Sequence, residues 1–131
     1  MDEERVRLVA SVYEAFGRGD IAAVMELIQE TEWHEAEGMP YGGVYRGGEA
    51  VAQNVFGPIA ADLPDFSVRP DELLPAGEDR VVALGRYRGN GRGGSLDSGF
   101  AHVWTVRDRK IVKFVQYADT HRFREAVGGE G

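Results

Sequence analysis

Residues 100–119 read FAHVWTVRDRKIVKFVQYAD and contain two apolar–polar alternations joined by Asp108-Arg109. Alternation with a period of two is typical of β-strands, because successive side chains point to opposite faces of a sheet. A two-residue connection between two such runs indicates a tight hairpin. The stretch therefore predicts two antiparallel strands, from Ser95 to Arg107 and from Lys110 to Asp119.

The same period extends upstream of this hairpin. Residues from Phe66 to Leu74 and from Arg80 to Gly89 predict two further strands, separated by Pro75-Ala76-Gly77. The sequence Gly89-Asn90-Gly91-Arg92-Gly93-Gly94 matches the dinucleotide fingerprint G-x-G-x-x-G. That fingerprint works only where a strand turns into a helix, and here it separates two strands. We interpret it as a hairpin loop.

Helical spacing dominates the first sixty residues. Apolar residues recur at every third or fourth position from Val6 to Phe16, which predicts a first helix. A second helix is expected after Asp20, whose carboxylate can cap it. A third is expected after Gly47-Gly48, with a break or kink at Gly57-Pro58.

Two short extended segments, Thr31 to Glu37 and Tyr41 to Arg46, lie between the second and third helices. Helices first and antiparallel strands last predict an α+β fold, with the helices packed on one face of the sheet. The length of 131 residues suits a single domain over residues 1–131, and Val127 to Gly131 is expected to be a frayed tail.

Composition excludes several functions. The formal net charge of −7 makes nucleic acid and membrane surfaces poor partners. The chain has no cysteine, which excludes disulfides, thiolate nucleophiles and zinc–thiolate sites. Neither an apolar leader nor a run long enough to span a bilayer is present, so a cytoplasmic protein is expected.

Three polar residues, Glu35, His102 and Gln116, lie on strand faces that otherwise carry large apolar side chains. Their neighbours on these faces are Trp33, Phe100, Trp104, Phe114 and Ala118. A buried polar group without a partner costs about 1–3 kcal/mol. Three such groups on three strands predict a lined cavity rather than a solid core. The alternative is that each is satisfied singly in the core or faces solvent.

A metal site is not expected. In a strand His34 points away from Glu35 and Glu37, so the three cannot converge locally. No HExxH or facial-triad spacing occurs, and the sequence implies no other cofactor. Asp119 ends the last strand, where it could either cap the segment from Thr120 to Ala126 or serve the site.

The order of these motifs resembles the SnoaL-like branch of the nuclear transport factor 2 (NTF2) and ketosteroid isomerase superfamily. The stretches that carry the resemblance are Gly19 to Val24, Trp33 to Gly38, Gly43 to Gly47, Phe100 to Val106, and Gln116 to Thr120. The resemblance implies a cone-shaped α+β barrel: a curved mixed sheet of about six strands, closed by three N-terminal helices around a deep pocket. It also implies a homodimer formed through the outer sheet face.

The resemblance places functional roles on particular residues. The isomerase's general-base carboxylate falls on Glu35, and its oxyanion-hole aspartic acid falls on His102. The cyclases' acid/base aspartate is matched by Asp119. The isomerase's oxyanion tyrosine falls on Val12, and a shift of one position to Tyr13 turns a helical side chain by about 100°. The residues expected to contact substrate are Trp33, Glu37, Tyr41, Tyr87, Trp104, Phe114, Gln116 and Ala118.

Two functions remain open at this point. The first is a cofactor-independent isomerase, cyclase or hydrolase that acts on a hydrophobic carbonyl or polyketide-like molecule. Glu35 would be its general base, and His102, helped by Gln116, would donate to the developing oxyanion. The second is a module that binds a small hydrophobic molecule, or only dimerises, without chemistry.

Overall fold

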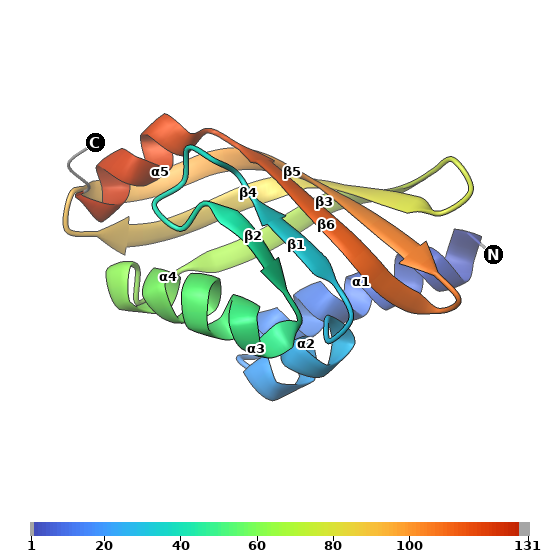
Figure 1. Cartoon of the computed structure of the whole chain (residues 1–131). Coiled ribbons are helices and arrows are strands. Elements are labelled where there is room, and N and C mark those ends of the chain that lie inside the picture. The colour runs from blue at the N-terminus through green and yellow to red at the C-terminus, as the bar shows by residue number, and fades with distance from the viewer. Residues whose placement is uncertain (1, 129–131) are drawn as a thin grey trace.

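The computed structural model describes residues 2–128, which form a curved sheet covered on one face by helices (Figure 1). The helical elements are α1 (Asp2–Gly17), α2 (Ile21–Leu27), α3 (Gly48–Val51), the π-helical segment η1 (Ala52–Phe56), α4 (Gly57–Asp62) and α5 (Thr120–Val127). The strands are β1 (Glu32–Glu35), β2 (Gly43–Arg46), β3 (Ser67–Ala76), β4 (Arg80–Gly91), β5 (Gly94–Arg107) and β6 (Lys110–Ala118). No helix in this range is both long and apolar enough to cross a membrane.

The sheet has six strands in the order β2-β1-β6-β5-β4-β3. Strands β1 and β6 run parallel, and every other neighbouring pair is antiparallel. The predicted α+β class and the mixed curved sheet are confirmed. The sheet is an open cone rather than a closed barrel, because β2 and β3 end the strand order and do not pair with each other.

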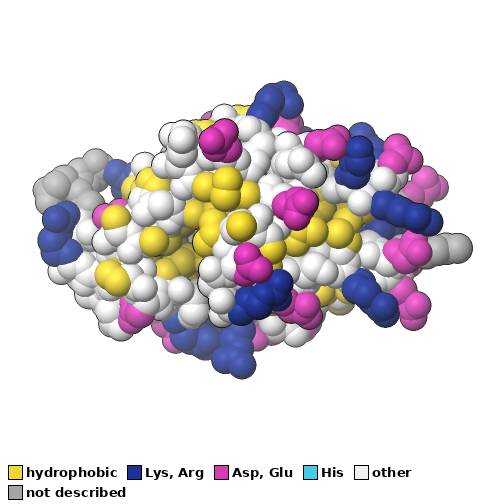
Figure 2. All heavy atoms as spheres, turned by 90° about the horizontal axis from the view of Figure 1, so that it is seen from below, with side chains coloured by type: hydrophobic (Ala, Val, Ile, Leu, Met, Phe, Trp, Pro, Cys, Tyr) yellow, Lys and Arg dark blue, Asp and Glu magenta, His cyan; other side chains and the backbone are white. Residues whose placement is uncertain are grey.

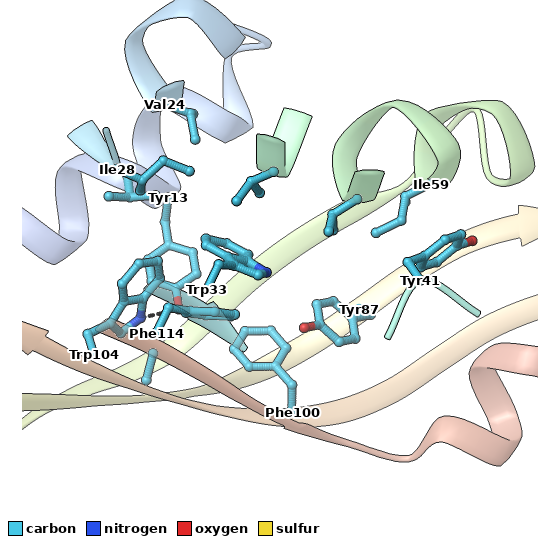
Figure 3. Packing of buried hydrophobic residues seen from close by; sticks show 14 of the residues in the cluster. Tyr13, Val24, Ile28, Trp33, Tyr41, Ile59, Tyr87, Phe100, Trp104 and Phe114 are labelled. Atoms are coloured by element: carbon cyan, nitrogen blue, oxygen red, sulfur yellow. Dashed lines mark hydrogen bonds between the residues drawn. The ribbon is translucent and has the colours of Figure 1, made fainter. Parts of the chain in front are cut away.

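Large aromatic side chains fill the space between the sheet and the helices (Figure 3). Trp33 of β1 stacks on Phe114 of β6 with ring centroids 3.7 Å apart, and Trp104 of β5 meets Phe114 at 4.6 Å. Helix α1 covers them with the buried Val9 and Tyr13. Burial of each such side chain contributes about 1.5–3 kcal/mol. The alternating pattern therefore fixes which face of the sheet packs against the helices, because the opposite choice would expose these side chains to water.

The expected break at Gly57-Pro58 is wrong, because one helical path runs from Gly48 to Asp62. The backbone widens instead: the Gly57 N–H bonds to the Ala52 carbonyl, five residues back. Pro58 lies in the first turn of α4, where a missing N–H costs little. The π-helical segment thus accommodates the proline that would otherwise end the helix.

The two ends of the sheet also differ in detail from expectation. Strands β4 and β5 continue to Gly91 and from Gly94, so the glycine-rich loop narrows to Arg92-Gly93. Val127 does not fray: it is the buried last residue of α5, and Gly128 closes that helix with φ 77°. Residues 129–131 of the expected tail lie outside the described range.

Gly85 of β4 provides a test of the sheet's tight curvature. A Cβ there would lie 2.2 Å from the Arg69 carbonyl oxygen and 2.7 Å from the Phe100 ring. We predict that Gly85→Ala lowers the free energy of unfolding by about 1–3 kcal/mol. Gly99→Ala is the matched control, because its Cβ would meet nothing closer than 3.7 Å. Equal denaturation midpoints for the two variants would contradict this packing.

Candidate functional site

A cavity lies between the concave face of the sheet and the helices. The side chains that line it come from Val12, Tyr13, Phe16, Trp33, Glu35, Val55, Phe56, Ile59, Phe66, Val68, Tyr87, His102, Trp104, Phe114, Gln116 and Phe123. The space free of protein atoms is about 510 Å³, part of which is solvent at the mouth. Water-sized spheres can be centred in only about 50 Å³ of it. The smaller volume holds a few waters, so a ring-sized ligand requires lining side chains to rotate.

A line of hydrogen bonds crosses one wall of this cavity. Trp104 Nε1 donates to the Tyr13 hydroxyl at 2.9 Å, and this hydroxyl lies 2.5 Å from His102 Nδ1. On the other side of the imidazole, His102 Nε2 lies 2.6 Å from the Tyr87 hydroxyl, which accepts from Gln116 Nε2 at 2.9 Å. We call these five residues the polar array. It ties helix α1 to strands β4, β5 and β6.

His102 is the centre of the polar array and is neutral. Burial alone lowers the pKa of its imidazole to about 3, because charging the ring in an apolar interior is unfavourable. Both ring nitrogens are in contact with tyrosine hydroxyls, so neither is free to reach a ligand. The expected role of His102 as a direct oxyanion donor therefore does not fit its contacts, and the hydroxyls that lie between its ring and the other cavity-lining groups belong to Tyr13 and Tyr87.

Glu35 carries an incompletely satisfied carboxyl group. Its Oε1 accepts from Trp33 Nε1 at 2.9 Å, while Oε2 is buried without a hydrogen-bond partner among the described residues. Burial raises the pKa of Glu35 to about 7, and hydrogen bonds from Trp33 and Gln116 oppose part of that rise. Near neutral pH the group therefore exists in both protonation states, as a general acid/base requires.

Gln116 joins the two polar parts of the cavity. Its Oε1 accepts from the backbone N–H of Ala36 at 3.0 Å, directly after β1, and its amide nitrogen donates to Tyr87. The parallel pairing of β1 with β6 brings this amide beside Glu35. Glu35, His102 and Gln116, which the sequence placed on three separate strands, all line the one cavity.

The other expected substrate contacts divide into two groups. Trp33, Tyr87, Trp104 and Phe114 line the cavity. Tyr41 is buried outside this lining: its hydroxyl donates to Asp62 Oδ2, and its ring packs edge-on against Phe123.

Three other residues that the sequence assigned to the site do not line the cavity. Glu37 is exposed in a turn, and Ala118 is half-buried at the end of β6. Asp119 is exposed, and its Oδ1 caps α5 by accepting the Arg122 N–H. The cap is therefore the role that the structure supports for Asp119.

Tyr13 lines the cavity, although it was not among the residues expected at the site. Helix α1 is buried on a broad flank, so the adjacent Val12 and Tyr13 both line the cavity despite their difference in direction. Tyr13 shares its helical face with Val9 and Phe16, and this spacing was the available signal.

Three half-buried phenylalanine rings lie at the rim of the cavity: Phe16 of α1, Phe56 of η1 and Phe66 before β3. Phe16 contacts Phe56 edge-on at 5.2 Å and Phe66 at 6.5 Å between ring centroids. Figure 2 views the helical side and shows hydrophobic side chains gathered in the middle of that face, with charged side chains around them. The half-buried aromatic rings therefore border the cavity on its helical side.

The curved sheet, its helical cover and the lined cavity define a protein of the NTF2-like type, and comparison with known proteins agrees. A model of the SnoaL-like domain matches residues 9–114, so the chain belongs to the SnoaL-like family. An NTF2-like protein of Burkholderia thailandensis is 38% identical with a TM-score of 0.87, over 93% of this chain and 95% of that one.

Two further solved structures are similar over almost their whole length. An NTF2-like protein of unknown function from Burkholderia pseudomallei is 28% identical with a TM-score of 0.85, over 95% of this chain and 97% of that one. TerC, co-crystallized with polyporic acid, is 25% identical with a TM-score of 0.85, over 96% and 99%. No curated protein matches this chain.

The raised pKa of Glu35 predicts a pH-dependent stability difference. The carboxyl releases its proton near pH 4.5 when unfolded and near pH 7 when folded, so the folded state holds the extra proton in between. Stability attributable to this group therefore falls as pH rises from 4.5 to 7 and then levels off. Relative to Glu35→Gln, the native protein should lose about 3 kcal/mol between pH 4 and pH 8. Chemical denaturation at each pH measures it, and a constant difference would contradict the assignment.

Proposed function

We propose that the cavity binds one small, mostly apolar molecule by a polar end and that Glu35 exchanges a proton with it. The observation that carries the proposal is the buried, unpartnered Oε2 of Glu35 in an otherwise aromatic cavity. Leaving such an atom unsatisfied costs about 1–3 kcal/mol, so a ligand that bonds to it gains that energy back.

The chemistry that suits this arrangement is proton transfer next to a carbonyl group. Ionised Glu35 removes a proton from the carbon beside the carbonyl, and a tyrosine hydroxyl of the polar array donates to the oxygen on which negative charge develops. Protonated Glu35 returns the proton at another position. The apolar walls exclude water, which strengthens both interactions. No cofactor takes part in these steps.

The substrate class follows from the walls. Aromatic side chains surround the polar groups, so a flat hydrophobic carbonyl compound, including a polyketide-like one, fits the lining. The co-crystallization of TerC, which has the same fold, with polyporic acid supports this class. Isomerisation and cyclisation both begin with such a proton transfer, and activation of water by the same carboxylate would give hydrolysis.

A non-catalytic binding role is the second candidate, favoured by the narrow cavity. About 50 Å³ leaves little room for a substrate to change shape during a reaction. In that case Glu35 and the polar array only orient the ligand. Thermal stabilisation by a ligand that stays unchanged in solution would then be expected.

Exchange of α-protons tests the two roles. In D₂O, NMR of 2-tetralone follows deuterium entering beside the carbonyl. The native protein should accelerate entry, with a rate that rises with pH through about 7 and then levels as Glu35 ionises. Glu35→Gln should lower the rate by about 10²- to 10⁴-fold. Glu37→Gln, the matched change on an exposed turn, should leave it unaltered.

Binding of the same ketone is measured in parallel by thermal shift. Retained stabilisation of Glu35→Gln with lost exchange supports the catalytic role. Stabilisation of the native protein without any exchange replaces it with the binding role. An exchange rate that is equal in the native protein and Glu35→Gln removes Glu35 from the mechanism.

We also propose that two copies associate through the outer face of the sheet. One row of paired residues crosses all six strands on that face: Val44, His34, Val115, Val103, Val82 and Leu74. Val44 is 55% exposed, Leu74 is 44% exposed, and Tyr117 beside this row is 59% exposed. Five of the six side chains in the row are apolar, and a partly exposed surface of this kind favours a covering partner.

Tyr117→Lys should therefore shift the protein from dimer to monomer, because it places a charge in the middle of the outer face. Light scattering coupled to size-exclusion chromatography measures the mass. Gln53→Lys on the helical side is the matched control and should remain a dimer. A native protein that elutes as a monomer at high concentration would contradict the proposed interface.

A further inference from the structure

The hydrogen atoms of the polar array do not match its contacts in number. The donors to count are those that face the four contacts of the array. Trp104 contributes its one N–H, and Gln116 contributes the one of its two N–H groups that faces Tyr87, because the other lies toward Glu35. The neutral His102 contributes one N–H, and the hydroxyls of Tyr13 and Tyr87 contribute one hydrogen each. Five hydrogens therefore serve four contacts. One donor hydrogen therefore remains without an acceptor within the polar array.

The left-over hydrogen belongs to a tyrosine. Trp104 and Gln116 are donors in any arrangement, so their hydrogens are fixed on Tyr13 and Tyr87. If His102 carries its proton on Nδ1, it donates to Tyr13, Tyr87 donates to Nε2, and the Tyr13 hydrogen is free. If the proton is on Nε2, the roles reverse and the Tyr87 hydrogen is free.

We propose that His102 is a positioning residue whose tautomer selects whether Tyr13 or Tyr87 donates the hydrogen bond to a ligand oxygen. Movement of one proton between the ring nitrogens, with both hydroxyls rotating, transfers the free donor from one side of the imidazole to the other. No heavy atom has to move. The imidazole stays neutral because it is buried among Phe100, Phe114 and the tyrosines.

The two tautomers of His102 suit ligands that lie in different parts of the cavity. Tyr87 is on the side of Gln116, whose amide also lies beside Glu35. Tyr13 is on the opposite side, next to Trp104. A ligand that shares its polar end with Glu35 is therefore served by Tyr87, in the Nε2–H tautomer. This assignment for a ligand rests on the proposed function, whereas the tautomer choice itself does not.

Variants lacking one hydroxyl should fix the tautomer in opposite ways. In Tyr13→Phe, an Nδ1–H would face a phenyl ring, whereas an Nε2–H donates to Tyr87 and leaves its hydroxyl hydrogen facing the cavity. Nε2 should therefore carry the proton, since a buried N–H without a partner is the costlier outcome. In Tyr87→Phe the same argument places the proton on Nδ1.

Nitrogen-15 NMR of histidine-labelled protein at pH 7 identifies the protonated ring nitrogen directly. The signal of His102 is assigned by its loss in His102→Gln, against the solvent-accessible His34 and His121. We expect one protonated nitrogen in the native protein, Nε2 in Tyr13→Phe and Nδ1 in Tyr87→Phe. The same nitrogen in both variants, or two protonated nitrogens in the native protein, would overturn the proposal. If either variant fails to fold, the spectrum of the native protein still shows whether His102 has one or two protonated ring nitrogens.

Addition of 2-tetralone to the native protein provides a separate readout. Growth of the Nε2–H signal on binding supports selection of Tyr87 beside Glu35, and growth of the Nδ1–H signal contradicts it. If the variants switch tautomer but the native protein shows no proton exchange on the ketone, the tautomer proposal stands and the catalytic function is rejected. If the native protein catalyses exchange but the tautomer is the same in every variant, only the tautomer proposal is rejected.

Discussion

The contact of one buried imidazole with two tyrosine hydroxyls is the interaction on which the site depends. His102 on β5 holds Tyr13 of α1 at one nitrogen and Tyr87 of β4 at the other. A buried polar group that loses its partner costs about 1–3 kcal/mol, so α1 cannot slide over the sheet without breaking this arrangement. The helix is thus fixed at the distance that leaves a cavity rather than a closed core.

The same cavity shows where the protein gives up stability. Each polar side-chain atom of the array has at least one hydrogen-bond partner, but Glu35 keeps one carboxyl oxygen without a bond among the described residues. A sequence selected for stability alone would fill this position with an apolar side chain. Local departures of this kind are typical of functional sites, because the unsatisfied group is the one that is available to a ligand.

Much of this arrangement could be predicted from the sequence because it follows from strand period. Alternation placed Glu35, His102 and Gln116 on inner faces, and parallel pairing of β1 with β6 then brought Gln116 beside Glu35. The position of Tyr13 and the path of the third helix could not be predicted, because both depend on how the helices pack. The breadth of the buried flank of α1 decides whether Tyr13 enters the cavity, and the widened turn at Gly57 lets Pro58 remain helical. The spacing of Tyr13 with Val9 and Phe16 indicates a buried helical face, but how far that face reaches into the cavity depends on tertiary packing, and so does the widened turn.

Direct titration of Glu35 tests the account most sharply. Carbon-13 NMR of the side-chain carboxyl, assigned by comparison with Glu35→Gln, follows its ionisation between pH 3 and pH 9. A carboxyl desolvated inside an aromatic cavity should titrate with a midpoint near pH 7. A midpoint near 4.5, the ordinary value of a glutamate in water, would show that the group is solvated and that no such cavity surrounds it.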